Sequence, residues 1–113
     1  MAIRKLTEDV FLVTLLEDKS IAVDIKNICK IAEKDKDCDV IIDFTLVDVI
    51  TSTDINNLFT LRELLQENGR HLILCNLFCW TKGIFNVLGL NDVFKFSADK
   101  YEALEFLQKC TKS

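Results

Sequence analysis

The sequence offers one polar cluster that could carry chemistry, the run Thr51-Ser52-Thr53-Asp54. It stands immediately before an apolar periodic segment that begins at Ile55, and such residues typically accept hydrogen bonds from the free N–H groups of a helix's first turn. Capping alone accounts for the run. The positive end of a helix dipole also tolerates a phosphate. A phosphate adds about −1.5 to −2 charges, which would alter any interface covering the helix. If the cluster has a role beyond capping, that role is a switch and not catalysis.

The other reactive side chains do not suggest an active site. A serine hydrolase would need Ser52, His71 and a carboxylate to meet, but the sequence has no G-x-S-x-G elbow. Cys75 lies in an apolar run, where burial would raise its pKa, and Cys79 has no histidine near it in sequence. A single histidine and no paired C-x-x-C motif leave a zinc site without ligands. We expect no enzyme activity, no metal and no cofactor.

Length and composition narrow the class of protein further. A chain of 113 residues has room for one domain, expected to span residues 1–113, and its half-hydrophobic composition is that of a globular protein. The formal charge is −4, and residues 1–56 carry 12 acidic against 7 basic side chains, so a nucleic-acid partner is not expected. No apolar run approaches the roughly 18 residues of a membrane span. The five cysteines lie mostly inside apolar runs, and we expect them to be reduced and buried. We expect a cytoplasmic protein without membrane insertion.

Hydrophobic patterning predicts the strands that would position the cluster. Residues 39–44 and 71–76 are nearly unbroken apolar runs, typical of strands buried on both faces. Two further runs, residues 3–6 and 10–15, are separated by Thr7-Glu8-Asp9 and predict an antiparallel pair. A short strand is expected over residues 93–96.

Four amphipathic segments predict helices between and after these strands. The first has apolar residues at Ile21, Ile25, Ile28 and Ala32. The second begins at the hydroxyl cluster and ends at Asn68-Gly69. The third is expected to turn a stripe inward before Gly89, and the fourth to begin at Ser97 and bury a second stripe. The two stripes are, respectively, Trp80, Ile84, Val87 and Leu88, and Tyr101, Leu104 and Leu107.

The predicted order β-β-α-β-α-β-α-β-α describes an α/β domain. Its mixed sheet would have about five strands, with residues 39–44 in the middle, and about four helices packed against it. Because crossover connections are right-handed, the later strands should be parallel.

The segment from about residue 39 to about residue 107 resembles the STAS domain, and specifically the bacterial anti-sigma factor antagonists. In that family a buried strand ends in Asp, as at Asp43, and a loop leads to an Asp-Ser-Ser-Gly-like tetrad, where Ser52 falls on the phosphorylated serine. Gly69 precedes the strand that ends at Asn76. The closing signature is matched by the run Gly89-Leu90-Asn91-Asp92-Val93-Phe94. Within the tetrad, Thr51 stands for the usual Asp and Asp54 for the usual Gly.

The resemblance implies a non-enzymatic regulator with the STAS-like fold. Such a protein binds a serine-kinase anti-sigma factor and frees the sigma factor; the kinase then phosphorylates the serine and breaks the complex, and a phosphatase resets it. Ser52 would be the phosphorylated residue, with Thr53 or Thr51 as alternatives. The implied docking face comprises Val47, Asp48, Thr51, Ser52, Thr53, Asp54, Asn56, Asn57 and Thr60.

The resemblance also leaves a second interpretation open. A STAS module can bind a partner without being phosphorylated, either as a scaffold of a stress-sensing assembly or as a cytoplasmic subunit of a lipid-transport ATPase. The two departures in the tetrad bear on this choice, because a carboxylate at Asp54 would repel a phosphate on Ser52.

Overall fold

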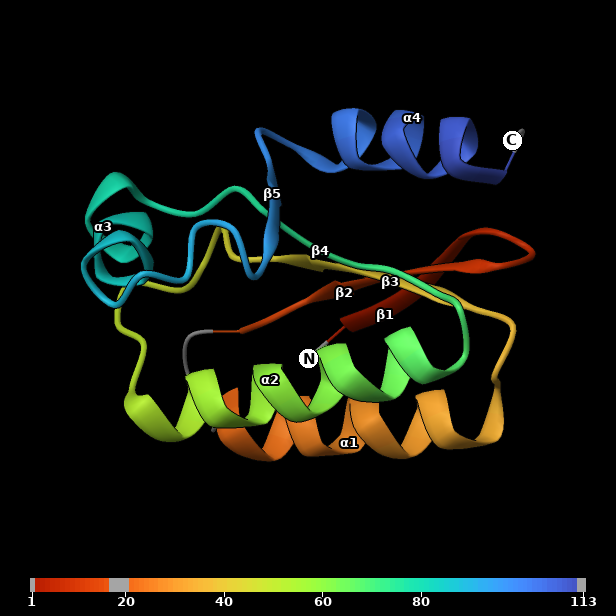
Figure 1. The fold of residues 1–113 in the computed structure, drawn as a ribbon, viewed down its shortest axis with the longest axis horizontal. Coiled ribbons are helices and arrows are strands. Elements are labelled where there is room, and N and C mark those ends of the chain that lie inside the picture. Colours follow the sequence, from red (N-terminus) through yellow and green to blue (C-terminus); the bar gives the residue numbers. More distant parts are fainter. Residues whose placement is uncertain (1, 17–20, 112–113) are drawn as a thin grey trace.

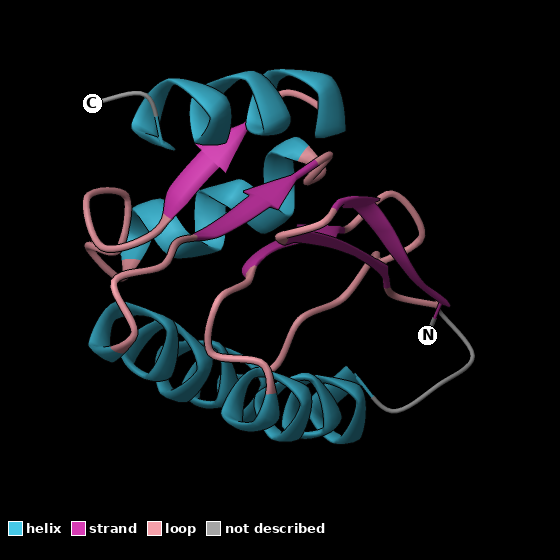
Figure 2. Ribbon diagram, turned by 90° about the vertical axis from the view of Figure 1, so that its right-hand side faces the viewer, coloured by secondary structure: helices cyan, strands magenta, loops and turns pink. Residues whose placement is uncertain are grey.

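The protein forms a three-layer α/β structure around one five-stranded sheet (Figure 1, Figure 2). The computed structural model describes residues 2–16 and 21–111. The elements follow the predicted order: β1 Ala2–Thr7, β2 Val10–Thr14, α1 Ile21–Lys34, β3 Asp39–Asp43, α2 Ser52–Glu67, β4 Leu72–Cys75, α3 Cys79–Val87, β5 Lys95–Ser97 and α4 Lys100–Thr111.

The strands lie in the sheet in sequence order, from β1 at one edge to β5 at the other. β1 pairs with β2 antiparallel, and the pairs β2–β3, β3–β4 and β4–β5 are parallel. The mixed sheet, its antiparallel start and the central place of β3 are therefore as expected from the sequence. Because β3 and β4 are parallel, their carboxyl ends lie side by side, and the loops that follow them leave the sheet at the same end (Figure 1).

Two apolar cores fill the space on either side of the sheet. α1 and α2 cover one face and α4 covers the other (Figure 1). Alternate residues of β3 serve the two sides: Val40 and Ile42 belong to the core under α1 and α2, and Ile41 belongs to the core under α4. This double burial is why residues 40–42 form an unbroken apolar run and not an alternating one.

The predicted apolar faces of the last two helices are wrong in part. On α3 the buried side chains are Thr81 and Phe85, while the predicted inward stripe is exposed. On α4, Tyr101 is 72% exposed and Ala103 is buried in its place, with Leu107 also buried as expected. β5 begins two residues later than predicted, and α4 begins at Lys100 and not at Ser97. Helical spacing alone could not tell which side of these short helices meets the sheet.

Candidate functional site

The start of α2 is closed by a reciprocal capping box. Thr51 is the N-cap, and its hydroxyl accepts a hydrogen bond from the Asp54 N–H at 3.2 Å. The Asp54 carboxylate, 5% exposed, in turn accepts from the Thr51 N–H at 2.9 Å. This arrangement satisfies two of the donors that a helix start leaves free. Both Thr51 and Asp54 are thus committed to the fold of the turn.

Ser52 and Thr53 occupy the first two helical positions, and both side chains are exposed. The capping box uses the N–H groups of Thr51 and Asp54, so the N–H groups of Ser52 and Thr53 are the first-turn donors that it leaves over. A phosphate attached to either hydroxyl would lie at the positive end of the helix. The geometry therefore separates the tetrad into two capping residues and two accessible hydroxyls.

The loop between β3 and α2 is tied down at its first residues. The Asp43 carboxylate accepts hydrogen bonds from the Thr45 N–H at 2.9 Å, from the Thr45 hydroxyl, and from the Asn76 side-chain amide at 3.1 Å. Asn76 has a positive φ of 59°, which lets the chain turn out of β4 directly beside Asp43. The ends of β3 and β4 are thereby fastened to each other.

The middle of the same loop is held by α3. The indole N–H of Trp80 donates to both the main-chain oxygen and the carboxylate of Asp48, each at 3.1 Å. Phe78 stacks on Trp80, with ring centroids 4.6 Å apart and planes 7° from parallel. Sequence reasoning missed this contact because it assigned Trp80 to the core; the residue is 55% exposed. An aromatic residue in the first turn after a strand was the available signal.

The predicted docking residues do not all present side chains to solvent. Val47 is 1% exposed and packs in the core, and Asp54 is buried in the cap, so neither side chain can meet a partner. Asn57 is half-buried and donates to the Ala22 carbonyl on α1 at 3.1 Å. The side chains that do lie exposed are those of Asp48, Thr51, Ser52, Thr53, Asn56 and Thr60.

The serine and histidine that a hydrolase would need do not meet in the structure. His71 precedes β4 and Ser52 follows β3, so in a parallel sheet they lie at opposite ends. Burial, and then the nearby charge of Asp43, raises the pKa of the Cys75 thiol to about 12, which keeps it protonated. Within residues 2–16 and 21–111 no group of three or more His, Cys, Asp or Glu side chains is placed to hold a metal.

A family model described as the STAS domain matches residues 19–103, three quarters of the chain. The chain belongs to the STAS domain family. No curated protein matches its sequence significantly. In this STAS domain the predicted fold is thus confirmed at the level of family as well as of topology.

Several solved structures share this fold at low sequence identity. An anti-sigma-factor antagonist domain protein from Planctomyces limnophilus superposes with a TM-score of 0.75 and 18% identity, covering 94% of this chain and 97% of that one. A single-residue variant of RsbS from Moorella thermoacetica superposes with a TM-score of 0.79 and 13% identity, covering 99% of this chain and 97% of that one. The anti-sigma factor antagonist SpoIIAA in its unphosphorylated form superposes with a TM-score of 0.71 and 13% identity, covering 95% of this chain and 96% of that one. At such identities the likeness concerns the fold.

None of the helices that the structure describes is long and apolar enough to cross a bilayer.

Proposed function

We propose that this STAS domain is a cytoplasmic anti-sigma factor antagonist that binds a serine-kinase anti-sigma factor and is released by phosphorylation of Ser52. The observation that carries the proposal is the exposed Ser52 hydroxyl in the first turn of α2, beside a Thr51 hydroxyl already bound in the cap. The fold likeness to SpoIIAA, an antagonist solved in both unphosphorylated and phosphorylated forms, supports it. A phosphatase would return the protein to its binding state.

The switch would act through charge at the surface. A phosphate adds about −1.5 to −2 charges to a face that already carries Asp48, and a kinase partner covering that face would have to desolvate them. The N–H groups of Ser52 and Thr53 would stabilise the phosphate, while the Asp54 carboxylate would oppose it. We therefore expect that Ser52 is phosphorylated slowly and that this one phosphate strongly weakens binding of the kinase.

The test is phosphorylation by the kinase-type anti-sigma factor encoded nearest to this gene. Incubation with ATP should add one phosphate to Ser52, detected by mass spectrometry of the tryptic peptide. Ser52→Ala should abolish it and Thr53→Ala should preserve it. Ser52→Glu should weaken binding of the same kinase at least tenfold in calorimetry. A phosphate on Thr53 would relocate the switch and contradict the assignment of Ser52.

The absence of phosphate on residues 51–53 would refute the switch. It would favour the second interpretation, a phosphorylation-independent module, for which the likeness to a subunit in the structure of the stressosome is the supporting observation, with a TM-score of 0.77 and full coverage of that chain. Co-purification from native cells would then separate a stress-sensing scaffold from a subunit of a lipid-transport ATPase.

A further inference from the structure

α3 turns a row of large apolar side chains toward solvent. Together they form a surface that we call the α3 ridge: Phe78, Trp80, Ile84, Val87 and Leu88, between 37% and 85% exposed. Residues 80, 84, 87 and 88 are spaced to share one face of a helix. At 1.5 Å per residue the ridge runs about 12 Å along the helix axis. Contiguous exposed apolar surface of this kind typically marks a binding site.

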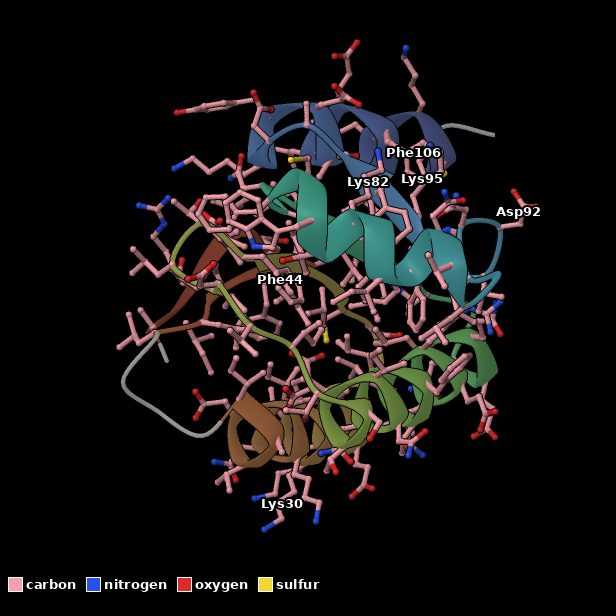
Figure 3. The ribbon with its side chains drawn as sticks, turned by 90° about the vertical axis from the view of Figure 1, so that its left-hand side faces the viewer. Lys30, Phe44, Lys82, Asp92, Lys95 and Phe106 are labelled. Carbon is pink, nitrogen blue, oxygen red and sulfur yellow. The ribbon has the colours of Figure 1, made fainter. Side chains whose placement is uncertain are left out.

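The ridge is a rigid surface that continues into the β3–α2 loop. The stacked rings of Phe78 and Trp80 and the hydrogen bonds from Trp80 to Asp48 hold it against that loop. The loop adds Val49, which is 71% exposed. Figure 3 shows α3 on the same side of the molecule as the start of α2. The ridge therefore extends the surface around Ser52, and its fixed aromatic pair has the character of a binding hot spot.

An acidic side chain lies toward each end of the ridge. Asp48 lies beside Trp80 at one end, and Asp92 follows α3 beyond the other end (Figure 3). The C-terminal end of the helix contributes a further negative partial charge there. Lys82, the one basic residue of α3, lies with its ammonium over the Phe96 ring at 5.7 Å, away from the ridge. The ridge is thus an apolar strip with an acidic group at each end.

We propose that the α3 ridge binds an amphipathic segment of a partner protein, apolar along its contact face and basic at its ends. This deepens the proposed function, on which it rests only in taking the partner to be the same anti-sigma factor. A second copy of this chain fits less well, because a symmetric contact would bring Asp48 of one copy toward Asp92 of the other. An anionic membrane would be repelled by the same carboxylates.

Trp80 is the single tryptophan of the chain and sits on the ridge, so its fluorescence reports binding directly. The probe is a synthetic amphipathic peptide of Leu and Lys, titrated into this protein. Its binding should saturate and shift the emission to shorter wavelength. The double variant Ile84→Asp, Val87→Asp should lower the affinity at least tenfold. Val23→Asp on α1, where Val23 is 55% exposed, is the matched control and should bind like the parent.

Specificity for basic ends distinguishes docking from general stickiness. A matched Leu and Glu peptide should bind at least tenfold more weakly, and Asp48→Asn with Asp92→Asn should remove most of that preference. Equal binding of both peptides would overturn the proposal. So would self-association by sedimentation that the double variant relieves, which assigns the ridge to a second copy, or a fluorescence shift with phosphatidylglycerol vesicles, which assigns it to a membrane.

The outcome separates this inference from the function proposed above. Phosphorylation of Ser52 without binding of the Leu and Lys peptide refutes the role of the ridge and leaves the switch intact. Peptide binding that depends on Ile84 and Val87, with no phosphate on Ser52, supports the ridge and refutes the switch.

Discussion

At the scale of single residues, neighbours in sequence have opposite roles. Thr51 and Asp54 bind each other's main-chain N–H groups, while Ser52 and Thr53 between them remain exposed. Asp54, which departs from the family pattern, replaces the flexibility of a glycine with a buried carboxylate that completes the cap. The departure thus has a structural reason of its own.

Removing that carboxylate should cost stability. Asp54→Ala leaves the Thr51 N–H without its partner, and we expect the free energy of unfolding to fall by about 1 kcal/mol. Urea denaturation followed by circular dichroism measures it. Thr53→Ala, at an exposed position of the same turn, is the control and should change stability by less than about 0.5 kcal/mol. Equal stability of Asp54→Ala and the parent would contradict the capping role.

The cysteines should differ sharply in reactivity. Cys79 is exposed, against the expectation of burial, whereas burial raises the pKa of Cys38 to about 11 and that of Cys75 to about 12. At pH 8 a thiol of pKa 12 is ionised in only about one molecule in ten thousand. N-ethylmaleimide should therefore label Cys79 in the native protein and Cys38 and Cys75 only in denaturant, as measured by peptide mapping. Native labelling of Cys75 at the rate of Cys79 would refute the burial of β4.

At the scale of elements, the site depends on the parallel ends of β3 and β4. Asp43 closes β3, Asn76 follows β4, and their side chains bond across the gap at 3.1 Å. This junction determines where the loop to α2 and the loop to α3 begin. The exposed Ser52 and the α3 ridge therefore share one structural support, although they are far apart in sequence.

Two substitutions at Asn76 separate its backbone from its side chain. Asn76→Gly keeps the positive φ accessible and loses only the bond to Asp43, so we expect a change within about 1 kcal/mol. Asn76→Val forces a β-branched residue to φ 59° and should lower the free energy of unfolding by about 2 to 4 kcal/mol. Denaturant titration measures both. Equal losses in the two variants would show that strain at this position is unimportant.

At the scale of the whole molecule, a charged cluster joins distant parts at the other end of the sheet. Arg70 lies 2.9 Å from a carboxylate oxygen of Asp39 and 3.4 Å from one of Asp9. Asp39 is 2% exposed and also accepts from the His71 N–H at 2.8 Å. The cluster links the β1–β2 hairpin, the start of β3 and the segment before β4.

Breaking this cluster should destabilise the fold more than any surface change. Arg70→Leu leaves the buried Asp39 carboxylate without its cationic partner, and we expect the free energy of unfolding to fall by about 3 kcal/mol at pH 7. Adding Asp39→Asn to Arg70→Leu should recover part of the lost stability.

The stability that Asp9 contributes should depend on pH. Its pKa is lowered mainly by the hydrogen bond from the Thr7 hydroxyl, and also by Arg70. The contribution of Asp9 to folding is therefore present above about pH 4 and is lost as the pH falls through the lowered pKa. Denaturant titrations at pH 7 and pH 3 measure the loss in Arg70→Leu and the pH dependence. A loss below about 1 kcal/mol in Arg70→Leu at pH 7 would contradict the role of the ion pair.

Local pattern sufficed for most of the fold because the strongest signals agree with one another. The apolar runs of β3 and β4 predicted the strands, and the hydroxyls before α2 and the pair Asn68-Gly69 predicted the helix start and end. Gly69 indeed has a positive φ of 70° in the structure. Parallel pairing followed from the helix that connects each of these strands to the next. The resemblance to the family rests on the same residues, because the family pattern consists of residues at strand ends and turns.

The sequence by itself determined the order of elements, the family and the place of Ser52 at a helix start. Only the tertiary structure decided which side of α3 faces the sheet, because Trp80, Ile84 and Val87 have the same helical spacing whether buried or exposed. It also decided that Val47 is core and that Trp80 binds Asp48, contacts set by how the ends of β3 and β4 come together. Periodicity records that a helix has an apolar face, whereas the packing of the sheet determines what that face meets.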